Sequence, residues 1–178
     1  MLSTRVGATW AAVGLTAAAL SGCSFHASTG GLSVSRTDLE KDITQRLQQA
    51  GEKPQTVTCK ENLPGVVGKT TRCELLLNGA DSFDVIVTAT KIDGEKVSYS
   101  MIPAASKKQL DKLVAKTVSE SAKVTVDSAD CDGGLEGKQG AEAHCDVTAD
   151  GGETRRQLVT VTKVEGLMMY FHVQPEAS

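Results

Sequence analysis

Residues 57–79 read VTCKENLPGVVGKTTRCELLLNG, and residues 129–151 read ADCDGGLEGKQGAEAHCDVTADG. In each stretch thirteen residues separate two cysteines, with a leucine and a glycine at the same places between them. A shift of 72 residues superposes the two stretches and continues without a gap to Pro103 and Pro175. Agreement at this many special positions indicates an internal duplication, in which one structural unit occurs twice.

A helix is expected ahead of each cysteine pair. Leu39, Ile43 and Leu47 recur at the spacing of one helical face, and Ser35 and Asp38 precede them at the spacing of a capping box. The second copy repeats this pattern at an offset of 71, with the cap residues Ser106 and Gln109 and the apolar stripe Leu110, Val114 and Val118.

About four strands are expected after each helix. In copy one they include residues 57–59, 71–77, 83–89 and 97–101, with a loop over 60–68 and turns at Asn78-Gly79 and Asp93-Gly94. Alternation places four side chains in the core beneath the helices: Tyr99 and Met101, and at the matching positions Phe171 and Val173. The predicted fold class is α+β, as two tandem repeats over 35–104 and 105–176, each with one helix packed on an antiparallel sheet.

The five cysteines indicate an oxidising compartment. Cys23 stands apart, which leaves an even number: Cys59, Cys73, Cys131 and Cys145. Four cysteines allow three pairings, and the equal spacing favours Cys59–Cys73 with Cys131–Cys145, because each copy then folds alone. A disulfide closing a loop of ~15 residues contributes about 3 kcal/mol, which matters to units of only about 70 residues.

Leu20-Ser21-Gly22-Cys23 has the form of a lipobox, the site at which a bacterial lipoprotein is cleaved and acylated. Residues 1–22 carry Arg5 and then an apolar run of about 15 residues, against the ~20 that span a bilayer, so a cleaved lipoprotein signal peptide is expected. Acyl chains on Cys23 would hold the protein on the extracytoplasmic side of the cell membrane, with residues 23–34 as lipidated terminus and flexible spacer. An uncleaved anchor and an ordinary secretory signal stay open as alternatives.

Composition argues against several functions. The formal net charge is −3 and aromatic residues make up 3%, which disfavours nucleic-acid binding and stacking platforms for bases or sugars. No spacing typical of a catalytic, cofactor or metal site occurs, so none is predicted. His26, His144 and His172 are expected to be exposed or structural, and Asp127, Asp130 and Asp132 to form a solvated acidic loop. Two surfaces remain possible for binding: an open strand edge and the exposed helix face with Lys108, Lys112 and Lys116.

The residue pattern resembles a family of small actinobacterial, notably mycobacterial, cell-envelope domains of unknown function that are often carried by lipoproteins. The resemblance covers nearly all of the chain after Cys23. In copy one it rests on Leu39-Glu40-Lys41-Asp42-Ile43, Pro54-Gln55-Thr56-Val57-Thr58-Cys59, Leu63, Val67-Gly68, Arg72-Cys73-Glu74-Leu75 and Val85-Ile86-Val87-Thr88. Copy two matches at Cys131, Leu135, Gly140, Cys145-Asp146-Val147 and Leu158-Val159-Thr160-Val161-Thr162, but it lacks the proline and has Gln157 in place of Val85.

The resemblance implies an envelope location and no catalytic residues. The function predicted from the sequence is a non-catalytic binding or structural module, whose partners are the membrane, through Cys23, and an envelope protein or glycan. The alternatives are an inhibitor of an exported hydrolase, a lipid or glycolipid carrier, and an enzyme.

Overall fold

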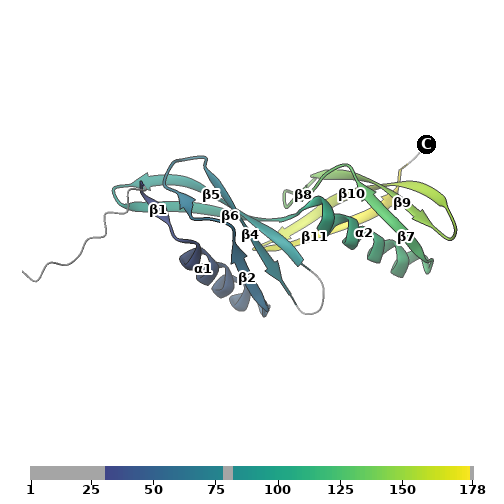
Figure 1. Cartoon of the computed structure of the whole chain (residues 1–178), viewed down its shortest axis with the longest axis horizontal. Helices are drawn as coiled ribbons and strands as arrows, with labels where there is room; N and C mark the ends of the chain where they lie inside the picture. The colour runs from purple at the N-terminus through teal and green to yellow at the C-terminus, as the bar shows by residue number, and fades with distance from the viewer. Residues whose placement is uncertain (1–30, 78–81, 177–178) are drawn as a thin grey trace, which may run out of the picture.

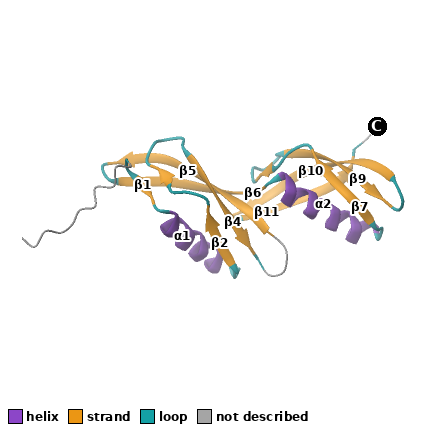
Figure 2. Ribbon diagram, viewed as in Figure 1, coloured by secondary structure: helices purple, strands orange, loops and turns teal. Residues whose placement is uncertain are grey.

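A computed structural model of the chain describes residues 31–77 and 82–176. The molecule is elongated, with the two repeats in line along its long axis (Figures 1 and 2). Each repeat contains one helix within the described residues. The fold is α+β with antiparallel sheets, as predicted. None of the described helices has the length and apolar character needed to cross a membrane.

The first repeat contains one long helix and a four-stranded antiparallel meander. The helix is α1 (Arg36–Gln49), and the sheet runs β2-β4-β5-β6, from β2 (Thr56–Cys59) through β4 (Thr70–Leu76) and β5 (Ser82–Asp93) to β6 (Lys96–Ala105). Two short strands lie outside this meander and pair with each other: β1 (Ser33–Val34) and β3 (Leu63–Pro64).

The second repeat has the same order of elements. Helix α2 spans Lys107–Ala122, and the sheet runs β7-β9-β10-β11, with bounds Val126–Cys131, Glu142–Ala149, Glu153–Glu165 and Met168–Pro175. Its counterpart of β3 is β8 (Leu135–Glu136). The predicted turn at Asp93-Gly94 joins β5 to β6, whereas Asn78-Gly79 lies outside the described residues.

The predicted apolar stripes form the cores. Leu39, Ile43 and Leu47 are buried beneath the first sheet, and Leu110 and Val114 beneath the second, while Val118 is half-buried. Each sheet contributes alternate residues of its central strands, such as Val85 and Val87 in the first repeat and Val159 and Val161 in the second. The predicted core residues Tyr99, Met101, Phe171 and Val173 pack against these clusters and are only partly buried.

Serine caps begin both helices, but only one capping box is complete. Ser106 accepts from the Gln109 backbone, and the Gln109 side chain accepts from the Ser106 backbone N–H at 2.8 Å. Ser35 accepts from the Asp38 backbone, yet the Asp38 carboxylate accepts from the Ser35 hydroxyl at 2.7 Å rather than from its backbone. The side chain of Asp38 is one methylene shorter than that of Gln109, and this explains the incomplete box.

Two segments predicted to lack regular structure contain strands. The loop over 60–68 includes β3, and the spacer over 23–34 includes β1. The two pair because Leu63 is fully buried and because the Gly65 N–H donates to the Leu32 carbonyl at 2.6 Å, an approach that leaves no room for a β-carbon. Such pairing depends on a distant partner, so a local pattern does not reveal it.

The disulfides join Cys59 to Cys73 and Cys131 to Cys145, which is the pairing that equal spacing favours. In each repeat the two cysteines stand directly opposite each other on neighbouring strands. A helix carboxylate supports each bridge: Glu40 accepts from the Cys59 N–H at 2.9 Å, and Asp111 from the Cys131 N–H at 2.8 Å. The matching carboxylates fix the same helix position over both sheets.

The repeats are not independent, although the equal cysteine spacing suggested that each folds alone. Strand β8 adds to the first sheet by pairing with Ala104 and Ala105 at the end of β6. The turn between β10 and β11 places Leu167, which is 6% exposed, in the buried cluster of the first repeat, and Met168 packs against that cluster. The side chain of Gln109 on α2 also donates a hydrogen bond of 3.0 Å to the carboxylate of Asp84 on β5, which connects the two repeats.

Candidate functional site: a groove in the second repeat

A groove of about 490 Å³ lies between the end of α2 and the sheet of the second repeat. Its volume falls within the range of ~300–1,000 Å³ typical of binding sites. Val147 and Gln157 are buried and Val118 and Val173 half-buried, and further lining residues are Ala122, Val124, Ala149, Asp150, Glu153 and Arg155. The groove therefore combines an apolar lining with charged side chains from the β9–β10 hairpin.

The groove lies at the end of the molecule farthest from β1. Helix α2 ends there, and the β9–β10 turn projects at the same end (Figure 1). Arg155 and Glu153 form an ion pair of 2.8 Å, and both side chains are 68% exposed. An exposed pair of this kind contributes little to stability and is available to a ligand.

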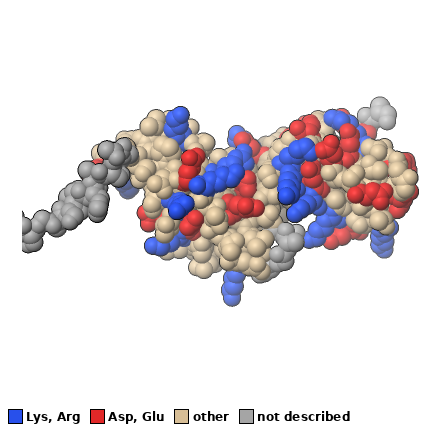
Figure 3. Space-filling model, viewed as in Figure 1, with Lys and Arg blue, Asp and Glu red and all other residues tan. Residues whose placement is uncertain are grey.

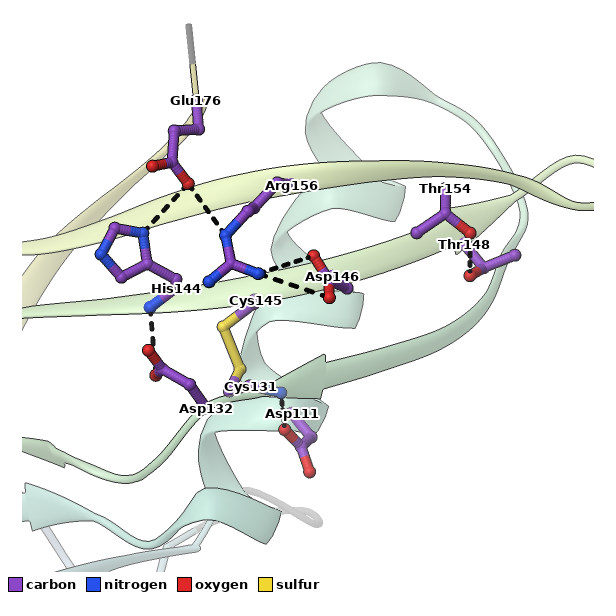
Figure 4. Close-up of polar contacts among 10 residues, drawn as sticks. All are labelled: Asp111, Cys131, Asp132, His144, Cys145, Asp146, Thr148, Thr154, Arg156 and Glu176. Atoms are coloured by element: carbon purple, nitrogen blue, oxygen red, sulfur yellow. Dashed lines mark hydrogen bonds and ion pairs between the residues drawn. A yellow bond between two sulfur atoms is a disulfide. The ribbon is translucent and has the colours of Figure 1, made fainter. Parts of the chain in front are cut away.

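A network of charged side chains lies beside the disulfide of the second repeat (Figure 4). Arg156 donates from Nε to Glu176 at 3.1 Å and from Nη1 to Asp146 at 3.3 Å. The same carboxylate oxygen, Oε2 of Glu176, also lies 3.0 Å from Nδ1 of His144. The network fastens Glu176, just after β11, to strands β9 and β10.

The matching positions of the first repeat explain this network. His144 and Arg156 correspond to Arg72 and Asp84, which form an ion pair of 3.3 Å. There the carboxylate of Asp84 also binds Gln109 from the following repeat. The second repeat has no following repeat within the described residues, and Glu176 supplies the bridging contact instead. The network ties Glu176 to the second sheet at the position where Gln109 contacts the first sheet.

A tyrosine links helix and sheet in the first repeat only. The Tyr99 hydroxyl donates to Asp42 on α1 at 2.8 Å. At the matching places the second repeat has Phe171 and Leu113, both packed against its core. A hydrogen-bonded pair has therefore been replaced by an apolar pair at the same contact.

This contact predicts an alkaline weakening of the fold. Burial and then the hydrogen bond to Asp42 raise the pKa of Tyr99 to about 12, from the ordinary value of 10.0. The folded state thus holds the phenol proton more tightly than the unfolded chain, so its stabilisation is complete below pH 10 and is lost as the pH rises towards 12. Urea unfolding at pH 8, 10 and 11 should show a steeper loss of unfolding free energy for the wild type than for Tyr99→Phe. Equal slopes would contradict the assignment.

The histidines and aspartates considered from the sequence do not form one site in the described residues. His144 on β9 is half-buried and contacts Glu176, and His172 on β11 is exposed, while His26 lies outside the described residues. Asp127, Asp130 and Asp132 are exposed, but the first two belong to strand β7 and not to a loop. Each has a protein partner: the Gly151 N–H, Lys107 and the His144 N–H, respectively. Within 31–77 and 82–176 no three His, Cys, Asp or Glu side chains gather as a metal site.

The remaining candidates are surface features. Lys108, Lys112 and Lys116 are exposed on α2. On the face drawn in Figure 3, basic and acidic side chains intermingle over both repeats. The site that sequence reasoning missed is the groove, because it forms where a helix end and two strands meet. One sign of this groove was present in the sequence: copy two has the polar Gln157 where copy one has the apolar Val85.

The comparisons with known proteins identify a family whose function is unknown. Residues 18–94 and 102–166 each match the family described as Domain of unknown function (DUF4333). Both matches end at the glycine of the same turn, Gly94 in copy one and Gly166 in copy two. No curated protein and no solved structure matches the chain. Since the two ranges cover most of the sequence, the chain belongs to this family and carries two tandem copies of its domain.

Proposed function

We propose that the protein is a lipid-anchored, non-catalytic binding module of the cell envelope, with the groove of the second repeat as its binding site. The observation that carries the proposal is the open, apolar-lined groove at the end of the molecule away from β1. The ligand expected there is a protein segment, since no aromatic side chain lines the groove within the described residues. Sugar-binding sites usually offer an aromatic platform, so a glycan fits this groove less well.

The anchoring proposal rests on the sequence and on the cysteines. The first family match begins at residue 18 and so includes the Leu20–Cys23 lipobox. The four other cysteines form two disulfides, which persist in oxidising compartments outside the cytoplasm. Both features support a protein held on the extracytoplasmic side of the cell membrane.

If Cys23 is acylated, replacing this one cysteine should release the protein from the membrane. In cells fed an alkyne-bearing fatty acid, the wild-type chain should take up label and sediment with membranes, because two or more acyl chains give stable anchoring. Cys23→Ser should lose the label and appear in the soluble extracytoplasmic fraction, while Ser24→Ala should behave as wild type. Label that persists in Cys23→Ser would refute acylation at this cysteine.

The binding proposal is tested by placing a photo-crosslinking amino acid at Arg155 in the full chain in intact cells. We expect a discrete protein adduct that is lost when Val118→Trp fills the groove. The same probe at Glu74, an exposed position on the first sheet, is the matched control. Identical adducts from both positions, or an adduct unaffected by Val118→Trp, would remove the groove as the binding site.

A further inference from the structure

The junction between the repeats shows what this type of groove receives. Leu167 and Met168 at the β10–β11 turn pack into the buried cluster of the first repeat. That cluster contains Leu47, Leu75 and Val85, with Phe83 and Met101 packed against it. A hairpin tip of one repeat therefore completes the core of the repeat before it.

The groove residues of the second repeat correspond to this same cluster. Shifted by the repeat offsets, Val118, Val147, Arg155, Gln157 and Val173 match Leu47, Leu75, Phe83, Val85 and Met101, respectively. The groove is thus lined by the counterparts of residues that belong to, or pack against, the cluster that the tip of the neighbouring repeat joins. Its expected occupant is the tip of another β-hairpin of the same kind.

The two contacting surfaces have changed their character together. Between the repeats, Phe83 and Val85 accompany the apolar tip Leu167-Met168. In the groove these positions are Arg155 and Gln157, and the matching tip of the first repeat is Glu95-Lys96. Arg155 and Glu153 in the groove are thus opposite in charge to Glu95 and Lys96, and all four residues are exposed.

The two surfaces lie too far apart to meet within one molecule. The β5–β6 turn, which contains Glu95, lies at the end where β1 lies, and the groove lies at the opposite end (Figure 1). We therefore infer that the groove binds the β5–β6 turn of a second copy of this chain, head to tail. This inference rests on the proposed function, because it names the partner of the same groove.

A head-to-tail contact leaves one groove and one tip unfilled at the two ends of an open assembly, and none in a closed ring. Such a heterologous interface builds rings or open filaments rather than closed dimers of two-fold symmetry. Assemblies larger than two chains should therefore appear as the protein concentration rises.

The test is a charge swap in the full chain, followed by cross-linking in intact membranes. A photo-crosslinking residue at Lys96 should give adducts at two and more times the chain mass, with the cross-linked peptide containing residues 153–157. Glu95→Arg or Arg155→Glu alone should reduce these adducts at least tenfold, and the two changes together should restore them. Glu61→Arg, at another exposed site of the first repeat, should have no effect.

Each result decides between the two ideas. Failure of the double variant to restore adducts, although its thermal unfolding matches the wild type, would overturn the inferred contact. So would a Lys96 probe that labels only other proteins. In that case, a crosslinking residue at Arg155 could still capture a different protein. That result would support the proposed binding function, with a partner other than a second copy of this chain. Absence of adducts from both positions would overturn both.

Discussion

Replacing Leu167 by alanine should destabilise the first repeat, although the residue belongs to the second. Leu167 is 6% exposed and lies in the cluster with Leu39 and Val85. Truncation of a buried leucine to alanine costs about 2–5 kcal/mol, because apolar contact is lost and a cavity remains. We also expect urea unfolding to change from one transition to two, since the tip couples the repeats. Fluorescent labels placed separately in each repeat would report the two transitions.

Val66→Ala is the matched control, since Val66 is 56% exposed on the first repeat and should change the unfolding free energy by less than about 0.5 kcal/mol. A loss below about 1 kcal/mol in Leu167→Ala, with a single transition retained, would show that the tip does not couple the repeats. Strand β8 would then be the main connection.

Removing the disulfide of the second repeat should lower its unfolding free energy by about 3 kcal/mol. The double variant Cys131→Ala with Cys145→Ala leaves no free thiol in that repeat, and both positions are buried. The loop closed by the bridge has a sequence separation of 14, and its closure restricts the unfolded chain. Such a loss is a large part of the 5–15 kcal/mol that usually stabilises a domain. Chemical denaturation under oxidising conditions measures it.

A reducing agent supplies the internal control. Dithiothreitol reduces both bridges of the wild type, so the wild type should approach the stability of the double variant measured in the same reductant, and the variant should respond only through its Cys59–Cys73 bridge. If the double variant loses less than about 1 kcal/mol, the native bridge does not stabilise the repeat through its loop.

The elements that the sequence predicted well are those with a short repeating period. The stripe Leu39, Ile43 and Leu47 identifies α1, alternation around Val85 and Val87 identifies β5, and equal spacing favours the observed pairs of cysteines. The helix stripe and the strand alternation depend on neighbours within two helical turns or a few strand residues, whereas the cysteine pairing depends on comparing the two copies. The duplication then carries the assignment from one copy to the other.

The contacts between repeats could not be predicted in this way. Leu135 and Glu136 are too short a segment to show a period, and they become a strand only because the end of β6 lies beside them. Leu167 follows a turn glycine, where a local reading expects an exposed residue. Comparison of the two copies holds the missing signal, because Glu95 stands where the second copy has Leu167. A position that changes from charged to apolar between copies marks a surface that has become buried.

Strand β6 runs out of the first sheet and directly into the cap of α2, with only Ser106 between them. No linker separates the repeats, so the groove is held at a constant distance from β1. With Cys23 acylated as we propose, the nine residues 24–32 separate the anchored cysteine from β1. Two chains anchored in the same membrane are confined to one surface, and this confinement raises the effective concentration of one chain around the groove of the other. A contact too weak to detect in dilute solution can therefore be occupied at the cell surface.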